Sequence, residues 1–170
     1  FPNEAELHVE IARGLHGLGK TEQAWNAVQR GLKLAPDDHG LALILGMLHE
    51  EAGDFAQAAT AFEKVLRVDR SIVLALLGAG KAYMRMGKPN QAIQPLEEAV
   101  KKSPGNADAY AELGACYLRL KRHEQAVSAF RSAIELFDGD PLAFRGLGVA
   151  LISLGRPQEA LTPLQRALSI

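Results

Sequence analysis

The 170-residue sequence contains a single cysteine, few aromatic residues and no excess of charge of either sign. Because Cys116 is the only cysteine, an internal disulfide framework is excluded. The formal net charge of −1 argues against a surface that holds nucleic acid or anionic lipid, since both need clustered lysine and arginine. No apolar run approaches the roughly 18 residues of a membrane span, so direct membrane insertion is not expected either.

The sequence starts with Phe1 rather than methionine and has no signal-like start. We therefore expect a piece of a longer protein or a processed form, from which targeting segments could have been removed. The compartment consequently stays open between the cytoplasm and a bacterial envelope. Apolar residues make up 48% of the chain, which is enough for the continuous core of one domain-sized unit.

The sequence repeats itself with a period of 34 residues and needs no insertion or deletion. The segments MGKPNQAIQPLEEAV (86–100) and LGRPQEALTPLQRAL (154–168) are nearly the same and lie two periods apart. We count repeat positions from Ala5. Position 20 is alanine in every repeat, and position 8 is always small. The repeats span 5–38, 39–72, 73–106, 107–140 and 141–170, the last without its connector.

Each repeat predicts two amphipathic helices, over positions 1–14 and 17–30. Position 15 is glycine in four of the five repeats, and Lys121 holds it in repeat 107–140. This position is expected to supply the left-handed turn that ends the first helix. Pro89 and Pro157 fall at the first residue of the second helix, where a missing N–H costs nothing. Pro95 and Pro163 fall inside the second helix, where we expect a bend. The bend would set the curvature of the array, and a functional hinge is the alternative.

The segment LGACYLRLKRHEQAVSAF (113–130) carries the pattern L-G-x-x-Y … A-x-x-x-F of the tetratricopeptide repeat. The chain resembles this family over five consecutive repeats, with departures at Gly31, Val65 and His49. The resemblance implies an all-α fold, a right-handed superhelix of about ten antiparallel helices in a single domain. It also implies that the first helices line a concave inner wall. No separate capping helix follows the last repeat.

The side of the first helix opposite its core carries large apolar residues at repeat positions 2, 5, 6, 9 and 12. An exposed helix face is normally polar, and an apolar patch framed by charge usually marks an interaction surface. The sequence therefore predicts a groove for a peptide or an amphipathic helix of a protein partner. The predicted groove residues are Val9, Arg13, Leu43, Ile44, Met47, Leu74, Leu77, Lys81, Met84, Arg85, Glu112, Arg119 and Val149.

Three glycines on this face, Gly40, Gly78 and Gly146, are expected to leave room for the ligand. The alternative is that the apolar residues pack on one another across neighbouring helices. The charges on this face change sign along the array, a pattern that suits a polypeptide segment with both signs rather than a polyanion.

One subset of the family binds chaperone C-terminal carboxylates through lysine, asparagine and arginine. The matching positions here are Val9, Arg13, Ile44, Leu74 and Gly78, so this clamp is absent. A chaperone tail is therefore not the expected partner.

No arrangement of residues in the sequence supports catalysis, a cofactor or a metal. His8 and His49 occupy core positions and are expected to be packed and hydrogen-bonded. His16 and Glu50 share position 12 of adjacent repeats and predict a surface ion pair, because no third metal ligand is evident. Cys116 is expected to be a small packed residue, and no glycine-rich phosphate loop follows a strand. We therefore predict a non-enzymatic chain.

Three functions fit these observations. The first is a protein–protein interaction scaffold within a multiprotein assembly. The second is a self-assembling homo-oligomer, because the last helix lacks a cap and would expose a face with Leu161, Leu164 and Leu168. A longer array that has been truncated would expose the same face. The third is the substrate-recruiting region of a larger enzyme. The compact style of the repeats resembles bacterial proteins, which is an analogy only.

Overall fold

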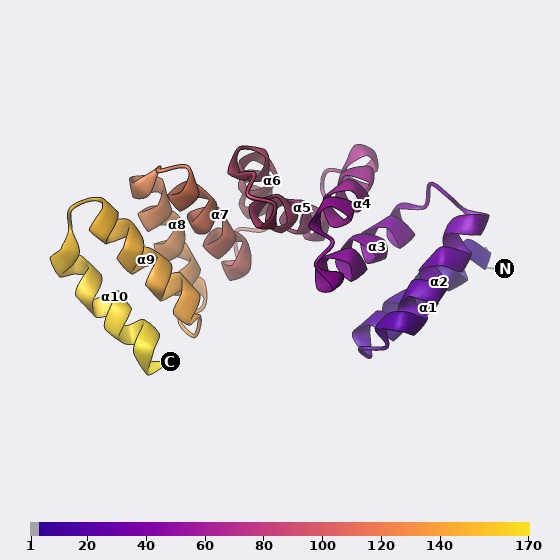
Figure 1. Cartoon of the computed structure of the whole chain (residues 1–170), viewed down its shortest axis with the longest axis horizontal. Helices are drawn as coiled ribbons and strands as arrows, with labels where there is room; N and C mark the ends of the chain where they lie inside the picture. The colour runs from indigo at the N-terminus through magenta and orange to yellow at the C-terminus, as the bar shows by residue number, and fades with distance from the viewer. Residues whose placement is uncertain (1–3) are drawn as a thin grey trace. The chain divides into compact units, whose positions relative to one another are not determined.

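The computed structural model describes residues 4–170, and this part of the chain forms ten α-helices and no strands (Figure 1). The all-α class predicted from the sequence is confirmed. Contacts divide the chain into two compact units, which we call unit 1 (residues up to Met86) and unit 2 (Gly87–Ile170). The helices of unit 1 are α1 (Glu4–Gly17), α2 (Thr21–Leu34), α3 (His39–Ala52), α4 (Phe55–Val68) and α5 (Val73–Arg85). Those of unit 2 are α6 (Pro89–Lys102), α7 (Ala107–Arg119), α8 (His123–Leu136), α9 (Pro141–Ser153) and α10 (Pro157–Ser169).

Unit 1 is built from helices that pack on their neighbours in the chain. α1 packs on α2 and α3 on α4, while α3 also contacts α1 and α5, and α5 packs on α4 (Figure 1). Ala24 and Ala58, both at repeat position 20, are fully buried, so their small side chains let the paired helices approach closely. The larger buried residues beside them include Val28, Leu41, Leu48 and Phe62.

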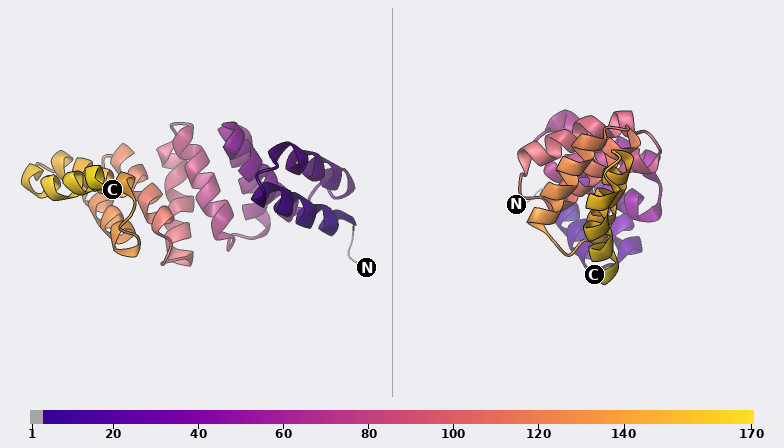
Figure 2. Two further views of the ribbon diagram at one scale, coloured as in Figure 1. Left: turned by 90° about the horizontal axis from the view of Figure 1, so that it is seen from below. Right: turned by 90° about the vertical axis from the view of Figure 1, so that its left-hand side faces the viewer.

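Unit 2 repeats this arrangement with α7 on α8 and α9 on α10. α6 packs on α7, and α8 packs on α9, so each of these two second helices is covered by the first helix of the next repeat. Figure 2 shows these helix pairs from two further directions. Leu96, Cys116, Phe130 and Leu151 are buried in this unit, each at most 3% exposed.

The turns between paired helices use the left-handed backbone predicted at position 15. Gly19, Gly53 and Gly155 have φ of 68°, 80° and 74°. Lys121 adopts φ of 58° at the same position, although a side chain disfavours this conformation. The backbone of the turn is therefore kept even where glycine is absent.

Capping residues and prolines stand at the starts and inside several of the helices. Asp38, Asn106 and Asp140 cap the first helices that follow them, each accepting a hydrogen bond from a backbone N–H of the first turn. α6 and α10 continue through Pro95 and Pro163, which are buried; the bend itself stays a prediction. Within the described residues, no helix is both long enough and apolar enough to cross a membrane.

Candidate functional site

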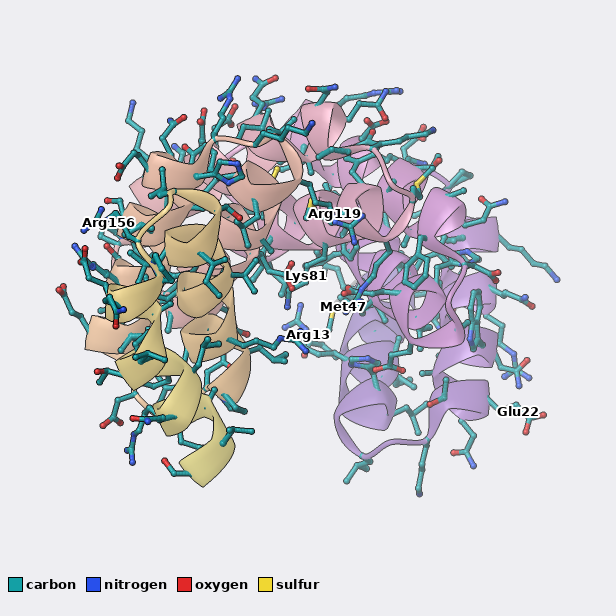
Figure 3. All side chains as sticks on the ribbon, turned by 60° about the vertical axis from the view of Figure 1, so that its left-hand side comes forward. Arg13, Glu22, Met47, Lys81, Arg119 and Arg156 are labelled. Carbon is teal, nitrogen blue, oxygen red and sulfur yellow. The ribbon has the colours of Figure 1, made fainter. Side chains whose placement is uncertain are left out.

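A cavity of about 290 Å³ opens on unit 1 beside α3 and α5. We call it the Met47 cavity. Figure 3 shows Arg13, Met47 and Lys81 on one face of unit 1, with Glu22 on the opposite face. Helix α3 contributes three lining residues and α5 four, so the first helices of two consecutive repeats build most of the wall. The lining residues are His16, Met47, Glu50, Glu51, Phe62, Leu74, Leu77, Gly78 and Lys81.

The floor of the Met47 cavity is apolar. Leu77 is 8% exposed and Phe62 only 1%, so both are fixed by packing against their neighbours. Leu74, at the edge, is 48% exposed and Met47 is half-buried. Methionine is flexible and packs against differently shaped partners. This floor is therefore suited to an apolar side chain from another molecule.

The ring of Phe62 reaches the cavity because two glycines flank it. A Cβ on Gly46 would lie 2.7 Å from Phe62 Cε1, and a Cβ on Gly78 would lie 2.5 Å from Phe62 Cε2. Phe130 fills the same space in unit 2, where a Cβ on Gly146 would lie 2.3 Å from its Cζ. The expectation that Gly78 and Gly146 leave room for a ligand is therefore wrong, because the chain's own rings occupy that room.

The rim of the cavity is charged. His16 Nε2 lies 2.8 Å from Glu51 Oε1, whose side chain is 50% exposed. The predicted ion pair of His16 with Glu50 is wrong in its partner: the structure pairs His16 with Glu51, and Glu50 lines the same cavity. Lys81 completes the rim from α5. Two carboxylates and one lysine thus surround an apolar floor.

A second cavity of unit 1, of about 490 Å³, lies beside α1 and the start of α3. Arg13 Nη1 lies 3.2 Å from Glu10 Oε1, and the Asp38 carboxylate accepts the N–H of Leu41. Three carboxylates against one arginine make this cavity acidic. Its lining residues are Glu6, Leu7, Val9, Glu10, Arg13, Asp38, His39 and Gly40.

The predicted groove residues fall into four groups. Met47, Leu74, Leu77 and Lys81 line the Met47 cavity, and Val9 and Arg13 line the second cavity. Leu43, Ile44, Met84 and Arg85 line neither of these two cavities. Glu112, Arg119 and Val149 belong to unit 2.

Four of the predicted groove residues expose only a small part of their apolar side chains. Val9, Ile44, Leu77 and Met84 are at most 9% exposed. For them the alternative interpretation, packing against the chain itself, describes the structure. Leu74 and Val149 are 48% and 44% exposed, so they do offer apolar surface.

Residues that the sequence did not single out also line the cavities, notably Phe62. Phe62 holds repeat position 24, which belongs to the core. The signal that its ring extends to the inner face is glycine at position 8 of its own repeat, Gly46, and at position 6 of the next repeat, Gly78. Asp38, a helix cap, is a further lining residue that was not predicted.

Two tyrosine–glutamate pairs join consecutive repeats. The Tyr83 hydroxyl of α5 donates to Glu63 of α4, and the Tyr117 hydroxyl of α7 donates to Glu97 Oε1 of α6 at 2.8 Å. Burial, followed by the hydrogen bond to the carboxylate, raises the pKa of Tyr83 to about 12. The same causes raise the pKa of Tyr117 to about 12. These pairs fix the helices of one repeat against the next.

His8, His49 and Cys116 line neither of the two cavities described above. His8 and His49 are expected to be hydrogen-bonded, but the Nδ1 atom of each is buried without a hydrogen-bond partner. His49 instead packs edge-on against Trp25, with its Nδ1 3.7 Å from Asp54 Oδ2. Burial raises the pKa of the Cys116 thiol to about 11, and its sulfur lies 3.4 Å from the Pro89 carbonyl oxygen. Over residues 4–170, no three His, Cys, Asp or Glu side chains are grouped to hold a metal.

A family model described as "Tetratricopeptide repeat" matches residues 9–75, 77–141 and 125–170. The human protein "Tetratricopeptide repeat protein 13" is 28% identical over 112 residues, which is 66% of this chain. The chain spans only 13% of that relative's length.

Similar solved structures extend over almost the whole chain. A crystal structure of MamA protein matches with a TM-score of 0.85 at 25% identity, covering 98% of this chain and 91% of that one. A second MamA structure matches with a TM-score of 0.83 at 26% identity, covering 94% and 93%. YrrB, described as "a TPR protein with an unusual peptide-binding site", matches with a TM-score of 0.84 at 22% identity, covering 95% and 84%. At that identity the match to YrrB shows the fold alone.

Proposed function

Because the chain belongs to the tetratricopeptide repeat family, we propose that it is a non-catalytic scaffold that binds a segment of a protein partner within a larger assembly. The segment places an apolar side chain in the Met47 cavity. The observation that carries this proposal is the apolar floor of Phe62, Leu77 and Met47 inside a charged rim. YrrB, which has the same fold, is described as carrying a peptide-binding site, so the fold can accommodate such a ligand.

The charges around the cavities favour a partner segment with a basic residue beside its apolar anchor. Glu51 is half exposed at the rim of the Met47 cavity, and Glu10 is 67% exposed in the second cavity. Exposed charges contribute little affinity but fix the orientation and register of a bound segment. The apolar anchor supplies the affinity, and the carboxylates select the residue beside it.

The test uses a display library of random-sequence peptides, selected on the 170-residue chain. We expect selected peptides to share one large apolar residue next to lysine or arginine. Leu74→Glu, at a residue 48% exposed, should weaken binding of a selected, fluorescently labelled peptide by at least about tenfold, or ~1.4 kcal/mol. Fluorescence anisotropy measures this change, and circular dichroism checks that the variant is folded.

Leu142→Glu is the matched control. Leu142 holds the same repeat position as Leu74, is 61% exposed on α9 of unit 2, and lines neither cavity of unit 1. The control should bind peptide as the parent does. Equal binding by Leu74→Glu and the parent would remove the Met47 cavity from the proposal, and Glu51→Lys separately tests the preference for a basic residue.

A further inference from the structure

Unit 2 repeats the arrangement that surrounds the Met47 cavity, two repeats later in the chain. α7 contacts α9 as α3 contacts α5. The ring of Phe130 lies between α7 and α9: a Cβ on Gly114 would lie 2.9 Å from its Cδ1, and a Cβ on Gly146 would lie 2.3 Å from its Cζ. Phe62 stands in the same relationship to α3 and α5. The residues of unit 2 that correspond to the lining of the Met47 cavity therefore lie together on α7 and α9.

Apolar side chains are exposed at this place. Leu142 corresponds to Leu74 and is 61% exposed, and Val149, which corresponds to Lys81, is 44% exposed. Leu142 and Val149 are about two turns apart on α9, which places both on one side of the helix. We call this region of unit 2 the Leu142 surface, and its members are Leu118, Arg119, Leu142, Arg145 and Val149.

The exposure of Leu142 does not depend on where the chain ends. Leu142 stands at repeat position 2, near the start of α9. Leu74 holds the same position in a repeat that two further repeats follow, and it is still 48% exposed. A following repeat therefore leaves position 2 open, and a ligand can reach the Leu142 surface.

The charge of the Leu142 surface is opposite to that of the rim of the Met47 cavity. Leu118 and Arg119 stand where that cavity has Glu50 and Glu51, so an apolar side chain and a guanidinium replace two carboxylates. Arg145, exposed on α9, adds a second guanidinium. The apolar part of the surface is thus bordered by two positive charges.

The carboxylates of α7 belong to another part of the helix. Asp108 and Glu112 stand in its N-terminal half, whereas Arg119 is its last residue. Glu112 corresponds to Ile44 of α3, which does not line the Met47 cavity. By this correspondence Glu112 lies outside the Leu142 surface, and the arginines determine which ligand the surface prefers.

An exposed guanidinium keeps its charge at any ordinary pH and binds a carboxylate through two parallel hydrogen bonds. From this charge complementarity we propose that the Leu142 surface binds a partner segment in which a large apolar residue is next to aspartate or glutamate. The apolar residue packs on Leu142 and Val149, and the acidic residue pairs with Arg145 beside Arg119. The proposal rests on the scaffold function proposed above and adds that the two units select segments of opposite charge.

A random-sequence display library selected on the Leu74→Glu variant tests this proposal, because that variant loses the Met47 cavity and keeps unit 2 unchanged. On the parent the Met47 cavity dominates the selection, since Leu142 is more exposed than Leu74 and covers less of a bound side chain. Peptides selected on the variant should carry a large apolar residue next to aspartate or glutamate. Adding Leu142→Glu should weaken binding of a selected, labelled peptide by at least about tenfold in fluorescence anisotropy.

Arg145→Glu, also added to Leu74→Glu, separates charge recognition from apolar contact. It should weaken binding of the acidic peptide by at least about fivefold, because an attraction becomes a repulsion. Binding should recover when lysine replaces the acidic residue of the peptide. Arg131→Glu is the matched control, since the Arg131 side chain is 53% exposed on α8 and is not part of the Leu142 surface. It should leave binding of the acidic peptide unchanged, and circular dichroism should show the parent's helicity for all variants.

The outcomes separate this proposal from the scaffold function on which it rests. If the parent selects peptides for the Met47 cavity but Leu74→Glu selects none, or selects peptides with lysine or arginine, the Leu142 surface is overturned and the scaffold function stands. Acidic peptides that bind equally well after Leu142→Glu, or equally well to the Arg145→Glu and Arg131→Glu variants, would also overturn it. If neither the parent nor the variant selects a peptide, both proposals fail.

Discussion

The ring of Phe62 occupies the space in which a side chain on residue 78 would lie, since a Cβ on Gly78 would come 2.5 Å from Cε2 and Cζ of that ring. Phe130 and Gly146 stand in the same relationship one unit later in the chain. The size of the residue at position 24 of one repeat therefore limits the residue at position 6 of the next. This relationship couples the packing of neighbouring repeats to the shape of the Met47 cavity.

Gly78→Ala should destabilise the chain by about 1–3 kcal/mol, although alanine favours a helix interior over glycine. The clash decides the sign, because the Phe62 ring is 1% exposed and its other edge lies against Gly46, so it cannot move directly away from residue 78. Urea denaturation measures the change in the free energy of unfolding.

Phe62→Leu in the same chain should remove the clash and recover part of the loss, giving a coupling energy of about 1 kcal/mol or more in a double-mutant cycle. Gly14→Ala is the matched control. A Cβ there meets no atom within 4 Å, so it should stabilise the helix by roughly 0.5–1 kcal/mol. Additive effects of the two changes at residues 62 and 78 would show that the ring and the glycine are not coupled.

The helices of this fold could be predicted from the sequence because the repeat leaves little freedom. A hairpin of two amphipathic helices cannot bury its apolar faces alone and must pack on its neighbours. The predicted second helices 21–34, 55–68, 89–102 and 123–136 agree with α2, α4, α6 and α8. The turn at Lys121 shows that the period, rather than the single residue, determined the backbone.

The candidate site could be predicted only in part, because a helical projection considers one helix by itself. Ile44 and Leu77 face away from the core of their own helix pair, yet neighbouring helices bury them. Phe62 belongs to the core by its repeat position, yet its ring lines the cavity through the gap left by two glycines. Burial at these residues depends on distances between helices, which the repeat pattern does not specify.

Lys121→Gly should stabilise the chain by about 1 kcal/mol. A side chain in the left-handed region costs roughly 1–2 kcal/mol, and glycine adopts this conformation almost without steric cost. Lys121 is exposed, so no packing is lost. Thermal and urea denaturation should both show the gain.

Lys101→Gly serves as the control for this prediction, since Lys101 is also exposed but lies in α6. That change should lower the stability by about 1 kcal/mol, the usual cost of glycine in a helix. If Lys121→Gly also lowered the stability, the left-handed lysine would not be a source of strain.

Cys116 should react with thiol reagents only when the chain opens. Its side chain is fully buried, and burial raises the pKa of the thiol to about 11, so very little thiolate is present at neutral pH. Ellman's reagent should label native protein far more slowly than urea-unfolded protein. Val149→Cys, at an exposed residue, provides a thiol that should react at once under native conditions. Fast labelling of Cys116 in the folded parent would contradict its burial.

The two tyrosine–glutamate pairs should make the stability fall at alkaline pH. The folded-state pKa of Tyr83 and of Tyr117 is about 12, above the ordinary value of 10.0, so the folded chain keeps protons that the unfolded chain has lost. This contribution is fully present below pH 10 and is lost as the pH rises through 12. Urea denaturation at several pH values between 10 and 12 measures this loss of stability. The measurements use a Cys116→Ala background, because the raised pKa of the thiol makes its own contribution to stability fall between pH 9 and 11.

The variant with both Tyr83→Phe and Tyr117→Phe should be less stable at neutral pH, by about 1 kcal/mol for each lost hydrogen bond. Its stability should also change less between pH 10 and 12, because neither phenylalanine can lose a proton. Tyr110→Phe is the control: it keeps both pairs and should retain the parent's alkaline slope. Parallel curves for the double variant and the parent would mean that the pairs do not carry the alkaline dependence. Convergence of the two curves toward pH 12 would instead show that both hydroxyls keep their protons until the repeats separate.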